Sequence, residues 1–352
     1  MSIVKIGIVG VGTISELHLN AYRSNPHVQI CAVCDLNEER AKQAADKYGA
    51  TKTYTSYQEM FAHAGIDAVS ICTWNNTHED IAVAAVQAGI DVLLEKPLTT
   101  TVESALRMEE AVNKSGQILQ VGYVRRYDNN AQLVKQFTEL GEFGSFYYAR
   151  ASSIRRIGNP GGWFADRSRS GGGPVIDIGV HVVDLCWYLM GRPKVKSVSA
   201  NTYYQLGNRA NVQHLAAYRA ADYDAAASSV EDMANALIRF EGGASLMLDA
   251  SFTLHAKENK TAIQLYGDKG GVEVDPVLSF TTERNNTILN TTPQTTHPGF
   301  HLDSAFQNEI DHFIECVQQR REPLSPVADG VEIMRMLCGI YESAELGKEI
   351  IF

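Results

Sequence analysis

Two short motifs in this sequence contain side chains of the types that transfer protons. Glu95 and Lys96 end an apolar run and precede Pro97, and Asp177 and His181 follow a run of three glycines. Lysine and histidine can take a proton from a hydroxyl group or return it, and a carboxylate can orient the reacting groups. The set therefore predicts acid–base chemistry on a hydroxyl-bearing substrate.

The first acid–base pair comes directly after a predicted buried strand, Val92–Leu94. Open α/β sheets bind ligands at the carboxyl ends of their parallel strands, so Glu95 and Lys96 are expected beside a cofactor or substrate. A lone Glu-Lys-Pro sequence is a weak signal, and its meaning depends on the segments before and after it.

The second pair lies on a predicted helix that begins near Pro174, a residue suited to a first helical turn. Asp177 and His181 are four residues apart, so they share one helical face, and Asp184 extends this stripe. The preceding glycines would let the backbone pass close to a ligand. A buried polar stripe needs partners or a wet cleft, so the alternative is a polar network that joins two domains. The other face is predicted to pack in the core through Val175, Ile178, Val182, Leu185 and Leu189.

A dinucleotide-binding turn is predicted near the start of the chain, where the strand Ile3–Val9 runs into Gly10-Val-Gly12-Thr-Ile-Ser15 and a helix. Gly10 permits a tight turn, and Gly12 lets backbone N–H groups approach a pyrophosphate at the helix N-terminus. Ser15 stands at a fingerprint position that is usually glycine or alanine. The predicted cofactor contacts of this turn are Gly10, Gly12, Thr13 and Ile14.

Asp35 ends the second predicted strand, at the position where an acid binds the hydroxyls of the adenine ribose. Its charge would repel a 2′-phosphate, so the sequence favours NAD over NADP. The alternative role for Asp35 is to cap the following helix, which Asn37 could also do.

A polar turn follows the predicted strand Ala68–Cys72 and is expected over the same cofactor groove. Its predicted cofactor contacts are Thr73, Asn75 and His78. Thr77 is a predicted helix cap, with Asp80 at the third helical position, and His78 falls in the first helical turn.

The elements that carry these residues change in kind along the chain. Up to residue 123, apolar strands alternate with helices, which predicts a parallel sheet covered on both faces. Further strands of this sheet are predicted at Val28–Cys34, Thr53–Tyr54 and Ile118–Val121. Beyond Tyr127, strands joined by tight turns predict an antiparallel sheet. Its predicted hairpins are Ala234–Phe240 with Ser245–Phe252 and Ile263–Tyr266 with Gly271–Val274, followed by an exposed loop at Thr281–Gly299 and helices at Ser304–Gln319 and Val327–Leu346.

Composition narrows the class of protein. The 352 residues carry a formal net charge of −10, which argues against nucleic acid as the main partner. No apolar run approaches the ~20 residues that span a bilayer, and we recognise no signal peptide, so we expect a cytoplasmic protein with reduced cysteines. Cys31 and Cys34 face opposite sides of a predicted strand, so we expect no metal site.

Taken in order, the motifs resemble the glucose–fructose oxidoreductase / inositol dehydrogenase (Gfo/Idh/MocA) family. The residues that carry the resemblance are Gly10 and Gly12, Thr73-x-Asn75-x-x-His78, Glu95-Lys96-Pro97 and Gly171-Gly-Gly followed by Asp177, His181 and Asp184. The resemblance implies an α/β Rossmann domain over residues 1–123. It also implies an α+β domain over residues 124–352 with a large, mainly antiparallel sheet, which serves substrate binding and oligomerisation. The last helix is a candidate to pack back on the Rossmann domain.

The resemblance also implies roles for the chemical residues. Lys96 would hold the reacting hydroxyl and relay its proton, His181 would be the general acid/base, and Asp177 would bind a neighbouring hydroxyl or orient the site. Glu95 would lie near the nicotinamide. Arg125 is predicted to contact substrate, with an interdomain salt bridge as the alternative. Further candidates for the pocket are Trp163, which could instead make a subunit contact, His255 and His301.

The expected function is NAD-dependent oxidation of a secondary hydroxyl on a sugar, inositol or related polyol, by a homo-oligomer that is a dimer or tetramer. One alternative is an NAD-dependent glycoside hydrolase that oxidises its substrate only transiently. The other is a regulator that senses a sugar or NAD without catalysis. The presence of Lys96, Asp177 and His181 argues against the regulator, because a sensor needs no proton relay.

Overall fold

The computed structural model describes residues 2–215, 219–220 and 223–352, and the chain divides into two compact units. Unit 1 comprises residues 1–127 and 302–334, and unit 2 comprises residues 128–301 and 335–352. Helix α10, Val327–Leu346, begins in unit 1 and continues in unit 2. Among the described residues, no helix is both long enough and apolar enough to cross a membrane.

Unit 1 contains a six-stranded sheet in which every pair of neighbours is parallel, with the order β3-β2-β1-β4-β5-β6. The inner strands are rich in Val, Ile, Leu and Ala because both faces of the sheet are covered there, whereas the edge strand β3 is Lys-Thr-Tyr. The strands are β1 (Val4–Val9), β2 (Val28–Cys34), β3 (Lys52–Tyr54), β4 (Ala68–Ile71), β5 (Asp91–Glu95) and β6 (Leu119–Gly122). The predicted parallel sheet is confirmed, and its order is that of a Rossmann fold.

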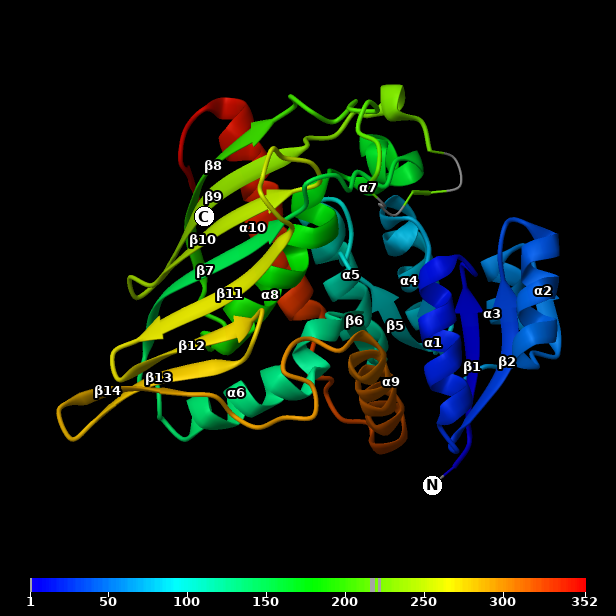
Figure 1. Cartoon of the computed structure of the whole chain (residues 1–352). Helices are drawn as coiled ribbons and strands as arrows, with labels where there is room; N and C mark the ends of the chain where they lie inside the picture. The colour runs from blue at the N-terminus through cyan, green and yellow to red at the C-terminus, as the bar shows by residue number, and fades with distance from the viewer. Residues whose placement is uncertain (1, 216–218, 221–222) are drawn as a thin grey trace. The chain divides into compact units, whose positions relative to one another are not determined.

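The helices of unit 1 connect these strands, and one helix from late in the chain joins them. They are α1 (Thr13–Ser24), α2 (Glu38–Tyr48), α3 (Tyr57–His63), α4 (His78–Gln87), α5 (Val102–Ser115) and α9 (Leu302–Gln319). Figure 1 shows α9, in brown, beside α1, in blue, and the two helices are in contact. Leu19 and Tyr22 of α1 pack in one buried core with Ile310 and Phe313 of α9.

Unit 2 is built on a nine-stranded sheet with the order β14-β13-β12-β11-β7-β10-β9-β8-β15. Its neighbours are antiparallel except for β7 and β10, which are parallel. The strands are β7 (Phe146–Ile154), β8 (Val195–Tyr203), β9 (Met233–Phe240), β10 (Ser245–Ser251), β11 (Lys260–Gly267), β12 (Gly270–Asp275), β13 (Ser279–Arg284), β14 (Thr287–Thr291) and β15 (Ile350–Ile351). The predicted large, mainly antiparallel sheet is confirmed, including both predicted hairpins.

One face of this sheet is covered by helices of unit 2. Helix α8 (Val180–Leu189) contacts β7, β10 and β11, which are neighbours in the middle of the sheet, and α6 (Asn129–Glu139) contacts α8 and β12 (Figure 1). Val182, Leu185 and Leu189 are buried, as the helical pattern predicts. The sheet therefore provides a rigid base for the helix that carries His181.

The predicted exposed loop Thr281–Gly299 is wrong over its first half. Residues 279–284 and 287–291 form the antiparallel hairpin of β13 and β14. The turn consists of Asn285 and Asn286, which have φ angles of 51° and 59°. Asparagine tolerates this left-handed conformation, and two such residues in succession are typical of a tight β-hairpin turn.

Candidate active site

The glycine turn after β1 has the shape that sequence reasoning requires. Gly10 has a φ of +85°, and a Cβ there would lie 2.6 Å from the carbonyl oxygen of Cys72. A Cβ on Gly12 would meet open space. No side chain caps the start of α1, so its first N–H groups point to a site suited to an anion. The Ser15 hydroxyl donates to the Gly12 carbonyl oxygen at 2.6 Å, which secures the turn from within.

Asp35 braces this turn with its carboxylate. The backbone N–H of Val11 donates to Asp35 Oδ2 at 3.0 Å, and the N–H of Asn37 donates to Oδ1 at 2.8 Å. Asn37, rather than Asp35, caps α2, because its side chain accepts from the N–H of Arg40. The Arg40 guanidinium lies 3.8 Å from Asp35 Oδ2 and is about half exposed.

The turn after β4 is held by hydroxyl and imidazole contacts. Thr77 Oγ1 lies 2.7 Å from the Trp74 carbonyl oxygen and 2.8 Å from Thr73 Oγ1. Thr77 occupies the N-cap position of α4 as predicted, but its side chain does not cap the helix, because its hydroxyl points back into the 3₁₀ turn of residues 75–77. Asn75 is buried, and His78 starts α4.

His78 is fully buried against two backbone carbonyl groups. Its Nδ1 lies 2.9 Å from the Pro97 oxygen and its Nε2 lies 3.3 Å from the Thr73 oxygen. Burial lowers the pKa of His78 despite these two carbonyls. The imidazole therefore links the turn after β4 to the segment that follows Lys96.

Glu95 is tied to α1 by a histidine that sequence reasoning missed. The carboxylate is 6% exposed, and its Oε1 accepts from His18 Nε2 at 2.8 Å. Its Oε2 accepts from the backbone N–H of Lys96 at 3.2 Å. On the other side of the ring, His18 Nδ1 lies 3.2 Å from Ser70 Oγ, which is 2.7 Å from the hydroxyl of Tyr22.

This buried chain of polar groups carries charge. Burial alone would lower the pKa of His18, but Cys72 and Glu95 outweigh it and raise that pKa well above its usual value. The protonated ring and the Glu95 carboxylate therefore form an ion pair inside unit 1. The sequence signal that could have identified His18 is its place on the face of α1 that also carries the core residues Leu19 and Tyr22.

Lys96 and Arg125 are both partly exposed; Lys96 directly follows β5, and Arg125 lies three residues after the end of β6. The Lys96–Pro97 peptide bond is cis. The neighbour of Arg125, Arg126, is fully buried, pairs with Asp329, and donates to the Leu324 carbonyl oxygen at 2.9 Å. Arg126 thus has a structural role within unit 1.

In unit 2, the helix of the second acid–base pair is almost entirely buried. From Gly172 to Leu189, every residue is buried except Asp177 and His181. Asp184, which extends the predicted polar stripe, is 0% exposed and therefore lies inside unit 2. Residues 175–179 form a π-helical turn that continues into α8, and π turns are frequent at functional sites. The accessible polar positions of this helix are therefore the two that the motif singles out.

The remaining candidates of unit 2 differ in their surroundings. Trp163 lies in a 3₁₀ turn, and its ring stacks on Phe164 with the centroids 3.9 Å apart. His301 stacks on His297 at 3.8 Å. His255 is exposed.

Comparison with known proteins matches both parts of the chain. Residues 4–123 match the model of an oxidoreductase family with an NAD-binding Rossmann fold. Residues 135–351 match the C-terminal alpha/beta domain of the same oxidoreductase family. Together the two matches cover most of the chain.

The sequences of individual relatives align with this chain over nearly their whole length. D-glucoside 3-dehydrogenase of Escherichia coli strain K12 is 30% identical over 350 residues, which cover 99% of this chain and 97% of the relative. Myo-inositol 2-dehydrogenase of Thermotoga maritima is 27% identical over 335 residues, which cover 93% and 92%. The crystal structure of an oxidoreductase domain protein from Kribbella flavida has a TM-score of 0.88 at 25% identity and covers 100% of this chain and 99% of its own.

Proposed function

Because the chain belongs to the Gfo/Idh/MocA family of oxidoreductases with an NAD-binding Rossmann domain, we propose that it oxidises a secondary hydroxyl of a sugar, inositol or related polyol with NAD. The same enzyme would reduce the corresponding ketone with NADH. The end-to-end similarity to a D-glucoside 3-dehydrogenase and a myo-inositol 2-dehydrogenase supports this class of substrate.

The observation that carries the proposal is the accessibility of Asp177 and His181 on an otherwise buried helix. A polar side chain among apolar residues costs free energy unless it has hydrogen-bond partners or contacts solvent or a ligand. Their accessible position fits contact with a polar substrate. The resemblance gives them these roles: His181 exchanges the proton of the reacting hydroxyl, and Asp177 binds an adjacent hydroxyl.

The residues of unit 1 fit a dinucleotide. The uncapped start of α1 and the open space at Gly12 suit a pyrophosphate, with Thr13 and Ile14 in the same turn. Asp35 would bind the ribose hydroxyls, and Thr73, Asn75, His78 and Glu95 would shape the groove towards the nicotinamide. The bound nucleotide accepts or supplies the hydride. Lys96 would hold the reacting hydroxyl and pass its proton on, and Arg125 and Trp163 would contact the rest of the substrate.

A screen of sugars and polyols with NAD and with NADP, followed by the absorbance of the reduced cofactor, tests the proposal. We expect turnover with NAD on at least one polyol. Lys96→Ala and His181→Ala should each lower kcat by about 100-fold or more, the usual size of a lost acid–base group. The exposed Lys114→Ala is the matched control and should behave like the wild type.

Three results would count against parts of the proposal. Folded Lys96→Ala and His181→Ala variants with wild-type turnover would refute their catalytic roles. A clear preference for NADP would refute the role of Asp35. Tightly retained cofactor, with glycoside cleavage but no release of NADH, would instead identify a hydrolase with transient oxidation.

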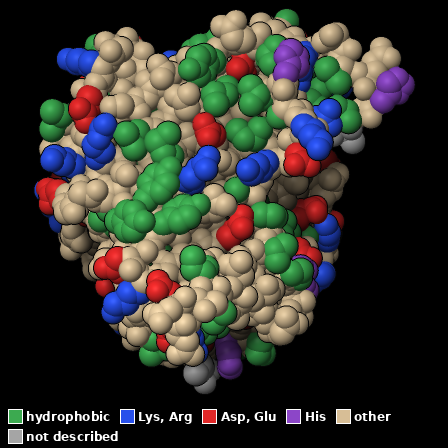
Figure 2. Space-filling model, turned by 60° about the vertical axis from the view of Figure 1, so that its left-hand side comes forward, with side chains coloured by type: hydrophobic (Ala, Val, Ile, Leu, Met, Phe, Trp, Pro, Cys, Tyr) green, Lys and Arg blue, Asp and Glu red, His purple; other side chains and the backbone are tan. Residues whose placement is uncertain are grey.

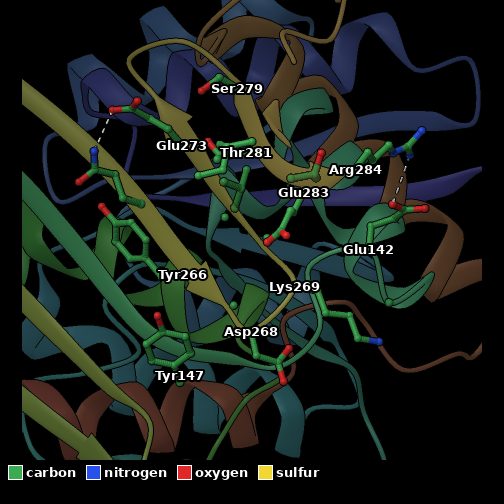
Figure 3. A pocket seen from close by; sticks show the side chains of 18 of the residues that line it. Glu142, Tyr147, Tyr266, Asp268, Lys269, Glu273, Ser279, Thr281, Glu283 and Arg284 are labelled. Carbon is green, nitrogen blue, oxygen red and sulfur yellow. Dashed lines mark hydrogen bonds and ion pairs between the residues drawn. The ribbon is translucent and has the colours of Figure 1, made fainter. Parts of the chain in front are cut away.

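We also propose that a second copy of the chain covers the outer face of the sheet in unit 2. Figure 2, turned towards this side, shows hydrophobic side chains gathered among charged ones. Tyr147, Met247 and Tyr266 are 58%, 37% and 37% exposed there. An open groove of about 860 Å³ runs along β11 to β14, and Figure 3 shows Tyr147 and Tyr266 on one side of it and Arg284 on the other. Light scattering should give the mass of a dimer or tetramer, and a monomeric mass at micromolar concentration would contradict it.

A further inference from the structure

The start of the helix that carries Asp177 is held by a buried acid from a distant part of the chain. Glu231, two residues before β9, is 1% exposed. Its Oε2 accepts from the backbone N–H of Gly173 at 2.9 Å. Its Oε1 accepts from the N–H of Val175 at 3.2 Å and from the hydroxyl of Tyr341 at 2.8 Å. One carboxylate thus binds two backbone N–H groups that are two residues apart and a side chain of α10.

The glycine run is explained by this contact. A Cβ on Gly172 would lie 2.0 Å from the Tyr341 hydroxyl, and a Cβ on Gly173 would lie 2.3 Å from the backbone oxygen of Glu231. At these two positions the close approach is to protein atoms, in place of the ligand that the sequence predicts. The glycines are therefore required so that the backbone can reach Glu231 and Tyr341.

The contact also supplies what the helix itself lacks. The first N–H groups of a helix have no partner within the helix. Pro174 precedes the helical turn and contributes no side-chain cap. The Glu231 carboxylate accepts from the N–H of Val175 and places negative charge at the positive end of the helix. It thus does what the side chain of an N-cap residue does at other helices.

The ionised form of Glu231 is the one that fits these partners. Gly173, Val175 and Tyr341 all present donors, and a carboxylate offers only acceptors. Burial raises the pKa of Glu231, and the bonds from Gly173, Tyr341 and Val175 oppose that rise. Arg167, whose guanidinium lies 5.5 Å from the centre of the Tyr341 ring, adds positive charge nearby.

We propose that Glu231 and Tyr341 are positioning residues that fix the helix start, and through it the backbone from which Asp177 and His181 project. This inference rests on the proposed function, since it concerns the geometry of the same acid–base pair. Asp177 follows Val175 by two residues, so a shift at the helix start reaches it directly. Both positioning residues belong to unit 2, whereas the predicted dinucleotide site belongs to unit 1, so the affinity for NAD should not depend on them.

The sharpest variant is Glu231→Gln, which keeps the size of the side chain and replaces one acceptor oxygen by an N–H₂ donor. This donor would face another donor, so the helix start must shift. We expect kcat on the polyol substrate to fall by about 100-fold, the cost of a misplacement of about 1 Å. The KM for NAD should stay within about twofold of the wild type, because uniform binding of the cofactor is unchanged.

Tyr341→Phe is the milder variant, because it removes one hydrogen bond and leaves the carboxylate with its two backbone donors. We expect kcat to fall about threefold to tenfold, in line with the loss of one bond to a charged group. The matched control is the exposed Glu241→Gln, which should keep wild-type kcat.

Hydrogen exchange separates this inference from the proposed function. In Glu231→Gln, the amides of residues 173–184 should exchange faster than in the wild type, with the amides of β1 and β4 unchanged. This readout needs no substrate, so it still tests the positioning role if no polyol is turned over. Folded Glu231→Gln and Tyr341→Phe proteins with wild-type exchange over residues 173–184 would overturn the inference, as would wild-type kcat in both.

Discussion

At the scale of single residues, unit 1 contains a buried carboxylate, that of Glu95, beside a buried histidine. Glu95 is the last residue of β5 and precedes Lys96, and His18 of α1 is its buried ion-pair partner. Ion pairs of this kind add little net stability over apolar packing, but removal of one partner leaves a charge that water cannot reach. His18 therefore matters through what its loss would do to Glu95.

His18→Ala should lower the free energy of unfolding by about 3–5 kcal/mol, because the Glu95 carboxylate would remain buried without its partner. Urea unfolding followed by circular dichroism measures this change. The exposed His63→Ala is the control and should change the free energy of unfolding by less than about 0.5 kcal/mol.

A double-mutant cycle identifies the cause of that loss. If the buried charge is responsible, adding Glu95→Gln to His18→Ala should recover part of the lost stability, because the two changes share one interaction. Strictly additive losses in the double variant would contradict this account and would assign the effect of His18 to packing alone.

At the scale of elements, the strands that are buried on both faces were predicted correctly, and the missed strands have one open face. The inner strands of unit 1, which are β1, β2, β4 and β5, are covered on both faces, so each forms an apolar run that stands out in the sequence. In unit 2, β7 contains Arg150 and alternates between buried and exposed positions, and β8 ends in Ala-Asn-Thr-Tyr. Neither was predicted, because a strand with one open face and polar residues resembles a loop.

Turn chemistry explains the other error at this scale. The residues of β14 are all exposed, so no hydrophobic alternation marks them. The signal was Asn285-Asn286, which supplies two left-handed residues in succession. A Thr- and Asn-rich segment was taken as a loop, although paired asparagines are themselves a hairpin signal.

Sequence patterns identified the candidate residues of the site that lie close together in the chain. Asp177 and His181 were found because their spacing places them on one helical face. His18 and Glu231 were missed because their partners, Glu95 and Gly173, lie far away along the chain. Such pairs are created by the packing of elements, and no local period in a single sequence records them.

At the scale of the whole molecule, the free energy of unfolding should fall in mild acid because one partly buried histidine, His312, resists protonation in the folded chain. Burial, helped by the positive charge of Arg321, lowers the pKa of His312 from 6.5 to about 4. In the folded chain its Nε2 lies 3.0 Å from the N–H of Leu324, from which it accepts only when neutral. The unfolded chain binds this proton at higher pH than the folded chain does. Stability is therefore complete above about pH 6.5 and is lost progressively as the pH falls towards 4.

His312→Gln keeps an acceptor for the Leu324 N–H but cannot take up a proton. Between pH 6.5 and 4, the wild type should lose about 1–2 kcal/mol that the variant keeps, a value reduced for the partial exposure of His312 to solvent. Urea unfolding of both proteins at several pH values in this window measures the difference. All other titrating groups are present in both proteins, so their contributions cancel in the difference between the two free energies of unfolding. The exposed His63→Gln controls for the loss of a histidine as such and should follow the wild type. Parallel curves for wild type and His312→Gln would mean that this proton is taken up equally by the folded and unfolded chains.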